Sequence, residues 1–164
     1  MLKNITDIQL KNKRVLIRVD YNVPLINGVV YDDFRIKKSL NTINYCINEG
    51  ASIILASHLG RPNGEYNSLL SLDPIAFRLE ELIKKDILFS EDCISDEAIE
   101  LSSQLQKGEI HLLENLRFHK GEKLNDEIFS WNLSRHADIF INDAFGTAHR
   151  SHSSNCAILK FYKN

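Results

Sequence analysis

Five short apolar runs, spaced along the whole chain, set the strongest limit on how this sequence can fold. They are rich in Val, Ile and Leu and are bounded by charged or turn-forming residues, as β-strands are. They cover residues 14–19, 51–57, 87–89, 110–113 and 138–141. Because the runs show little alternation of apolar and polar residues, we expect strands that are buried on both faces. This is the pattern of a parallel sheet.

A helix is predicted between most consecutive strands. Apolar residues recur at helical spacing from Ile36 to Ile47, and Gly50 ends that segment. Further helices are expected from Pro74 to Ile83, from Ser95 to Leu105 and over about residues 126–136. Strands that alternate with helices predict an α/β fold, a Rossmann-like parallel sheet with helices on both faces and right-handed crossovers. At 164 residues the chain is expected to form about one domain.

Cationic residues follow four of the five predicted strands. Because the carboxyl ends of parallel strands share one edge, these side chains are expected to meet there. They are Arg18 after the first strand, His58 and Arg61 after the second, Arg117 and His119 after the fourth, and His149, Arg150 and His152 after the fifth. Arg35, at the start of the first helix, can lean over the same edge, whereas Arg14, Arg78 and Arg135 fall elsewhere. Arginine suits phosphate and carboxylate, so the edge is predicted to bind a small anion.

Single residues of this set admit a second interpretation. A lone arginine after a strand is often a solvated cap, and Asp20 and Asn22 either cap a turn or contact the ligand. His111, inside a strand, is interpreted as structural. The sequence contains neither a phosphate-binding loop of the Gly-x-x-x-x-Gly-Lys type nor a Gly-x-Gly-x-x-Gly fingerprint. No carboxylate–histidine set has the spacing of metal ligands, so neither a nucleotide site nor a metal site is expected.

Composition excludes several classes of protein. The formal net charge of −2 argues against a general nucleic-acid binder. Cys46, Cys93 and Cys156 suggest neither a disulfide framework nor a metal pair, so we expect buried, reduced thiols. No run is long enough to span a membrane, and the first residues do not resemble a signal peptide, so the cytoplasm is the expected location.

Five blocks of sequence, in order, resemble the phosphoglycerate kinase family. The resemblance covers about residues 8–154, and five blocks in register make it highly specific. The blocks are Arg14-Val-Leu-Ile-Arg-Val-Asp-Tyr-Asn-Val-Pro24, Asp32-Asp-Phe-Arg-Ile36, Ser57-His-Leu-Gly-Arg-Pro62, Leu113-Glu-Asn-Leu-Arg-Phe-His119 and Asn142-Asp-Ala-Phe-Gly-Thr-Ala-His-Arg150.

The resemblance implies that residues 1–155 form the N-terminal, 3-phosphoglycerate-binding lobe of such an enzyme. Residues 156–164 fit the family less well and would form a divergent tail where the region between the lobes begins. In the family a second lobe holds Mg-ATP or Mg-ADP, and a phosphoryl group moves between ATP and the carboxylate of 3-phosphoglycerate. That lobe lies beyond Asn164, so a separate nucleotide-binding lobe is the implied partner.

The resemblance also implies roles for individual residues. Arg35 would be catalytic, orienting the reacting carboxylate and stabilising charge on the transferring group. The substrate-binding set would be Asp20, Asn22, Arg35, His58, Gly60, Arg61, Arg117 and Arg150. A secondary basic patch would consist of Arg18, His149 and His152.

Three functions remain open at this point. The chain is the substrate half of the kinase, inactive alone; or a non-catalytic module that binds 3-phosphoglycerate or a similar anion; or an interaction remnant of a truncated gene. Site residues that match the family favour the first two hypotheses over the third.

Overall fold

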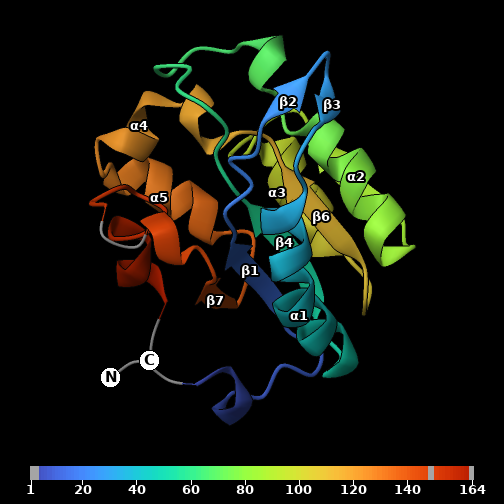
Figure 1. Ribbon diagram of the computed structural model, residues 1–164. Helices are drawn as coiled ribbons and strands as arrows, with labels where there is room; N and C mark the ends of the chain where they lie inside the picture. The colour runs from blue at the N-terminus through green and yellow to red at the C-terminus, as the bar shows by residue number, and fades with distance from the viewer. Residues whose placement is uncertain (1–3, 148–149, 163–164) are drawn as a thin grey trace.

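The computed structural model describes residues 4–147 and 150–162 and has helices on both sides of a central sheet (Figure 1). The sheet has five strands in the order β5-β6-β4-β1-β7, and all its pairings are parallel. The strands are β1 (Arg14–Arg18), β4 (Ser52–Ala56), β5 (Ile87–Ser90), β6 (Ile110–Leu113) and β7 (Ile139–Asn142). The predicted α/β class with a parallel sheet is confirmed, and the strand limits differ from the predicted ones by one residue or less.

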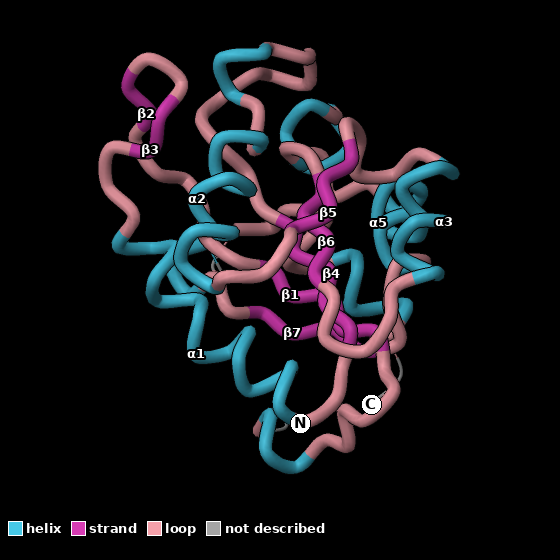
Figure 2. Tube along the Cα trace, turned by 90° about the vertical axis from the view of Figure 1, so that its right-hand side faces the viewer, coloured by secondary structure: helices cyan, strands magenta, loops and turns pink. Residues whose placement is uncertain are grey.

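Both faces of the sheet are covered (Figure 2). Helices α1 (Phe34–Asn48) and α2 (Asp73–Ile83) lie on one face, and α3 (Asp96–Gln104) and α5 (Glu127–Ser134) lie on the other. Side chains that alternate along the strands therefore feed two separate cores, which explains why the strand sequences are apolar throughout.

Neighbouring residues of β1 show this division. Ile17 belongs to the core that contains Ile43 of α1 and Leu79 of α2. Leu16, the preceding residue, belongs to the core that contains Phe129 and Leu133 of α5. All of these side chains are at most 4% exposed, so both faces of the sheet are dry at β1.

The chain reverses its direction across the sheet. It passes from β1 through β4 to β5 by way of α1 and α2, and then returns through α3 and α5 to β6 and finally to β7. Because all crossovers have the same handedness, the connecting helices move to the other face of the sheet when the chain reverses its direction across it. The loops after the adjacent strands β4 and β6 therefore leave toward opposite faces, and such a switch point is where open α/β sheets bind ligands.

Local sequence signals explain several element boundaries. The Ser95 hydroxyl accepts a hydrogen bond from the Ala98 N–H (3.1 Å), as expected of the residue that caps α3. Asn27 and Gly28 have φ angles of 51° and 73°, which is the geometry of a two-residue hairpin turn. This turn joins β2 (Leu25–Ile26) to β3 (Val29–Val30).

Several short helical segments were not predicted. They are α4 (Lys120–Lys123) and the 3₁₀ helices η1 (Ile5–Asp7), η2 (Ser68–Leu70), η3 (Leu116–Phe118), η4 (Phe145–Thr147) and η5 (Ala157–Phe161). Segments this short carry no hydrophobic period. The predicted helix over 126–136 is also shorter than expected and ends at Ser134. No helix among the described residues is both long and apolar enough to cross a membrane.

Two histidines are buried beneath α3. His111 of β6 and His136 after α5 have no exposed surface, and the Ser102 hydroxyl lies 2.8 Å and 2.6 Å from their Nδ1 atoms. His136 Nε2 donates to the Cys93 carbonyl oxygen (2.9 Å), so its Nδ1 has to accept the Ser102 proton when the ring is neutral. Ser102 then accepts from His111 Nδ1–H. The structural interpretation of His111 agrees with this arrangement.

Burial lowers the pKa of both histidines. The pKa of His111 falls to about 3 and that of His136 to about 4, from an ordinary value of 6.5, and in His111 the neighbouring ring of His136 adds to the effect of burial. At a pH below 6.5 the unfolded chain therefore takes up protons that the folded chain does not. The stability that the folded chain gains by keeping these rings neutral is complete above pH 6.5. It is lost as the pH falls toward the pKa values of the two rings in the folded chain.

We expect the free energy of unfolding to fall between pH 7 and pH 5, with each of these two histidines contributing roughly 1–2 kcal/mol. Urea denaturation at the two pH values measures the change. His111→Leu has no ring to protonate at this position, so its pH-dependent loss should be smaller by about one histidine's share. An unchanged loss in His111→Leu would contradict the assignment.

Candidate functional site

Hydrogen bonds join the loops after β1, β4 and β6 at the carboxyl edge of the sheet. The Gly60 N–H donates to Asn22 Oδ1 (2.9 Å), and Arg117 Nη1 donates to the Gly60 carbonyl oxygen (2.8 Å). Gly60 has a φ of +61°, and a Cβ there would lie only 2.7 Å from Cδ2 of Leu70. The position therefore favours glycine, and the fold brings these three predicted site residues together.

The buried side chain of Asn115 connects two of these loops. Its side chain has no exposed surface, and its Oδ1 accepts from the backbone N–H groups of Leu59 (3.2 Å) and Arg117 (3.0 Å). Its Nδ2 donates to the carbonyl oxygens of Leu59 (2.8 Å) and Leu70 (2.9 Å). A single amide thus holds the loop after β4 against the start of η3, which keeps the site rigid.

Arg35 reaches from the first turn of α1 to the loop after β1. Its Nη1 lies 2.9 Å from both carboxylate oxygens of Asp20 and 3.2 Å from the carbonyl oxygen of Asn22. The Arg35 side chain is 49% exposed, so much of the guanidinium faces solvent. A Cβ on Gly146 would lie 3.5 Å from Asp20 Oδ2, which places the loop after β7 beside the same carboxylate.

Arg18 and His58 form the buried floor of the site. Arg18 is 1% exposed and His58 is 2% exposed. Arg18 Nη2 donates to His58 Nδ1 (2.9 Å), its Nε donates to the Ser154 hydroxyl oxygen (2.9 Å), and its Nη1 donates to the Val19 carbonyl oxygen. Burial, together with the charges of Arg18 and Arg117, lowers the pKa of His58 to about 2, so this histidine is neutral at physiological pH.

The cations at this edge act on one another. Burial and then the positive charge of Arg150 lower the pKa of Arg117, and Arg18 and Arg61 lower it further, while Glu122 opposes them. Burial and the charges of Arg117 and Arg150 lower the pKa of His152. Most of the charged neighbours that act on these groups are positive, and a bound anion would relieve their repulsion. We call Arg18, His58, Arg61, Arg117, Arg150 and His152 the cation cluster.

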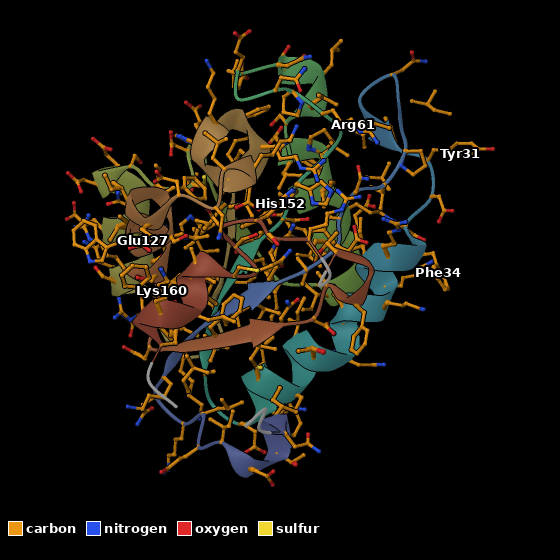
Figure 3. The ribbon with its side chains drawn as sticks, turned by 90° about the vertical axis from the view of Figure 1, so that its left-hand side faces the viewer. Tyr31, Phe34, Arg61, Glu127, His152 and Lys160 are labelled. Carbon is orange, nitrogen blue, oxygen red and sulfur yellow. The ribbon has the colours of Figure 1, made fainter. Side chains whose placement is uncertain are left out.

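Other predicted residues differ in their placement. Arg61 is exposed and makes no ion pair with another described residue (Figure 3). His149 lies outside the described residues. His119, which follows β6 and was expected among the strand-end cations, lies instead 3.2 Å from Asp92 in the loop after β5.

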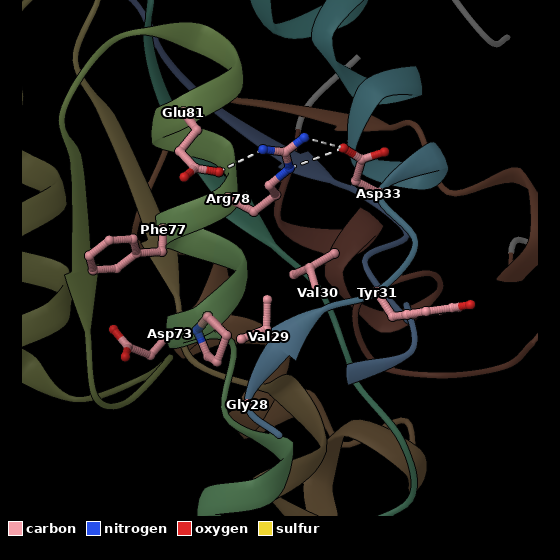
Figure 4. A pocket seen from close by; sticks show the side chains of 10 residues that line it. Gly28, Val29, Val30, Tyr31, Asp33, Asp73, Phe77, Arg78 and Glu81 are labelled. Carbon is pink, nitrogen blue, oxygen red and sulfur yellow. Dashed lines mark hydrogen bonds and ion pairs between the residues drawn. The ribbon is translucent and has the colours of Figure 1, made fainter. Parts of the chain in front are cut away.

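The arginines that were expected elsewhere are paired with acids. Arg78 of α2 donates to Asp33 (2.7 Å) and to Glu81 (2.6 Å), as Figure 4 shows. Asp33 directly precedes α1, so Arg78 ties the start of the helix that carries Arg35 to α2.

The described part of the chain also contains one group that could hold a metal ion, in which ligand atoms of Asp92, Cys93 and His119 lie within 4.8 Å of one another. Asp92 already accepts hydrogen bonds from His119 and from the Ile94 N–H.

The family model for phosphoglycerate kinase matches residues 5–164 of the sequence. The chain belongs to the phosphoglycerate kinase family. The five sequence blocks therefore resemble this family because they derive from it. The matched range includes residues 156–164.

Individual members of the phosphoglycerate kinase family agree with this assignment. A phosphoglycerate kinase of Pelotomaculum thermopropionicum is 49% identical over 159 residues, which are 97% of this chain and 40% of that protein. The structure of phosphoglycerate kinase from Pyrococcus horikoshii superposes with a TM-score of 0.89 at 33% identity, over 98% of this chain and 41% of that one. The structure of phosphoglycerate kinase from Coxiella burnetii superposes with a TM-score of 0.84 at 34% identity, over 97% of this chain and 39% of that one. The chain thus spans about 40% of the length of these phosphoglycerate kinases.

Sequence reasoning missed the buried polar residues that support the site. Glu122 of α4 has no exposed surface, and it accepts hydrogen bonds from the Ser154 hydroxyl (2.5 Å) and the Ser154 N–H (3.0 Å). Neither residue stands out in the sequence, because Glu122 lies in a charged segment and Ser154 in a serine-rich one. Two buried supports do lie inside a family block: Asn115, and Glu114, which accepts a hydrogen bond from the Asn115 N–H (2.7 Å).

Because the cation cluster is crowded, removing one positive charge should stabilise the ligand-free fold. We expect Arg150→Gln to raise the free energy of unfolding by about 0.5–1 kcal/mol at low salt. Inorganic phosphate should raise the melting temperature of the unmodified chain more than that of Arg150→Gln. Arg135→Gln, whose arginine pairs with Asp96, serves as the control and should gain no stability. A destabilised Arg150→Gln would show that repulsion within the cluster is unimportant.

Proposed function

We propose that this chain is the substrate-binding lobe for the phosphoglycerate kinase reaction and that it binds 3-phosphoglycerate at the cation cluster. One observation carries the proposal: two buried arginines, Arg18 of β1 and Arg117 after β6, meet at the loop after β4, where Arg18 donates to His58 Nδ1 (2.9 Å) and Arg117 donates to the Gly60 carbonyl oxygen (2.8 Å). Such an assembly costs stability unless an anion occupies it, and 3-phosphoglycerate carries a phosphate and a carboxylate.

The geometry supports a division of roles within the site. Arg117, Arg150 and Arg61, with His58, would hold the phosphate end of the ligand, because three arginines make this the more cationic part of the site. Asp20 and Asn22 would contact the glycerate hydroxyl and carboxylate region. Arg35, whose exposed guanidinium faces solvent from α1, would orient the reacting carboxylate and stabilise negative charge during phosphoryl transfer.

Mg-ATP or Mg-ADP, which the family uses, does not fit this edge of the sheet. The carboxylate of Asp20 is engaged with Arg35, and that of Glu122 with Ser154. Neither is available as a magnesium ligand in this arrangement. We therefore assign nucleotide and magnesium to a separate lobe and derive no step through them here. The cytoplasmic location stays a prediction from the sequence.

The chain should bind 3-phosphoglycerate with a dissociation constant on the order of 0.1–1 mM, because no closed second lobe excludes water from the charges. Affinity should fall with added salt. Arg150→Ala and Arg61→Ala should each weaken binding by about tenfold or more, since each removes a charged contact. Backbone amide shifts in an NMR titration report both affinity and location.

The control for this titration is Arg135→Ala. Arg135 pairs with Asp96 of α3, so its removal should leave affinity unchanged. Arg78 is less suitable, because it holds Asp33 at the start of α1. Equal losses in Arg135→Ala and Arg150→Ala, or amide shifts that avoid residues 20–22, 58–61 and 117, would reject the proposed site.

The isolated chain should transfer no phosphoryl group from ATP to 3-phosphoglycerate in a coupled assay, since the proposed reaction needs the second lobe. Turnover by the purified chain that disappears in Arg35→Ala would contradict this expectation. If binding occurs and adding a nucleotide-binding lobe of a family member restores turnover, the kinase half is favoured; binding without restored turnover favours a non-catalytic module.

A further inference from the structure

Glu122 is a buried carboxylate that the proposed reaction does not use directly. It lies on α4 with no exposed surface, and its two carboxylate oxygens accept the N–H and the hydroxyl proton of Ser154. Burial raises the pKa of Glu122, while the charge of Arg18 and the two hydrogen bonds from Ser154 oppose that rise. A carboxylate in this position must have a partner, and that partner, Ser154, also accepts a hydrogen bond from Arg18 of the cation cluster (2.9 Å).

The hydrogen bonds that start at Glu122 have a fixed direction. Ser154 has a single hydroxyl proton, and it goes to Glu122, because Arg18 Nε can only donate to the hydroxyl oxygen. Arg18 Nη2 likewise can only donate to His58 Nδ1. His58 Nδ1 therefore carries no proton, and the proton of the neutral ring lies on Nε2.

We propose that Glu122 is a positioning residue of the anion site, which acts through Ser154 and Arg18 to hold His58 as a neutral ring with its proton on Nε2. The inference rests on the proposed function, because it assumes that His58 donates this hydrogen to the bound anion. A protonated His58 would add a charge beside Arg18, Arg117 and Arg150. The Nε2–H tautomer offers a donor to the ligand without that cost.

Nitrogen-15 NMR of the histidine rings tests the tautomer without any ligand. In the unmodified chain, His58 should show an unprotonated Nδ1 and a protonated Nε2. In Glu122→Gln one of the two oxygens that accept from Ser154 is replaced by an NH2 group, which cannot accept the hydrogen that faces it. Ser154 therefore turns, and Arg18 loses its anchor. We expect the His58 signals in this variant to shift toward a mixture of the two tautomers.

Two further variants separate this role from a loss of packing. Ser154→Ala keeps the Glu122 side chain and breaks the link to Arg18, so it should change the His58 signals in the same way. Ser130→Ala removes another fully buried serine nearby, whose hydroxyl donates to the Ser153 carbonyl oxygen (3.4 Å). This control should leave the His58 tautomer unchanged.

Titration of the same variants with 3-phosphoglycerate gives the functional consequence. Glu122→Gln and Ser154→Ala should weaken binding by about tenfold, the effect of one misplaced charged contact. An unchanged His58 tautomer in both variants overturns the inference, as does a changed tautomer with unchanged affinity. If the unmodified chain does not bind 3-phosphoglycerate although the tautomer responds, the proposed function fails while the coupling from Glu122 to His58 stands.

Discussion

All five strands run in the same direction, and this constraint decides where the chain can place charge. The faces of the sheet are covered by α1 and α2 on one side and by α3 and α5 on the other, so the side chains of the inner strands β1, β4 and β6 are almost entirely buried, whereas the edge strands β5 and β7 are partly exposed. The amino edge and the carboxyl edge are the remaining places for polar chemistry. Because parallel strands deliver every following loop to one edge, cations that are far apart in sequence meet there.

Bringing the cationic side chains to one edge would not by itself hold them in place. Side-chain amides and carboxylates connect the loops that carry them and make the arrangement rigid. Asn115 bridges the loops after β4 and β6, and Asn22 bridges those after β1 and β4. Glu122 supports Arg18 from the segment after β6. These contacts keep like charges together without a ligand, at the expense of repulsion among them.

The fold was readable from the sequence because its signals are local. Apolar runs mark strands that are buried on both faces, and Ser95, Asp126 and the Asn27-Gly28 pair mark helix starts and a hairpin by their own hydrogen bonds or φ angles. That most of the predicted site residues gather at one edge of the sheet could be expected for the same reason, since they follow the strands directly. Their support could not, because Glu122 and Ser154 are 32 residues apart and meet only through tertiary packing. The role of Arg18 could not be predicted either. Its place at the end of a strand suggests a ligand contact, but all three nitrogens of its guanidinium donate to groups of the protein itself.

The strand order has a consequence for synthesis on the ribosome. β1 is made first, yet it lies inside the sheet, between β4 and β7, and β7 is the last strand to be made. One edge of β1 therefore stays without its neighbour until β7 has emerged, and closing it requires a contact of high sequence separation. Partly synthesised chains consequently expose an apolar strand edge, a surface that chaperones bind and that favours aggregation.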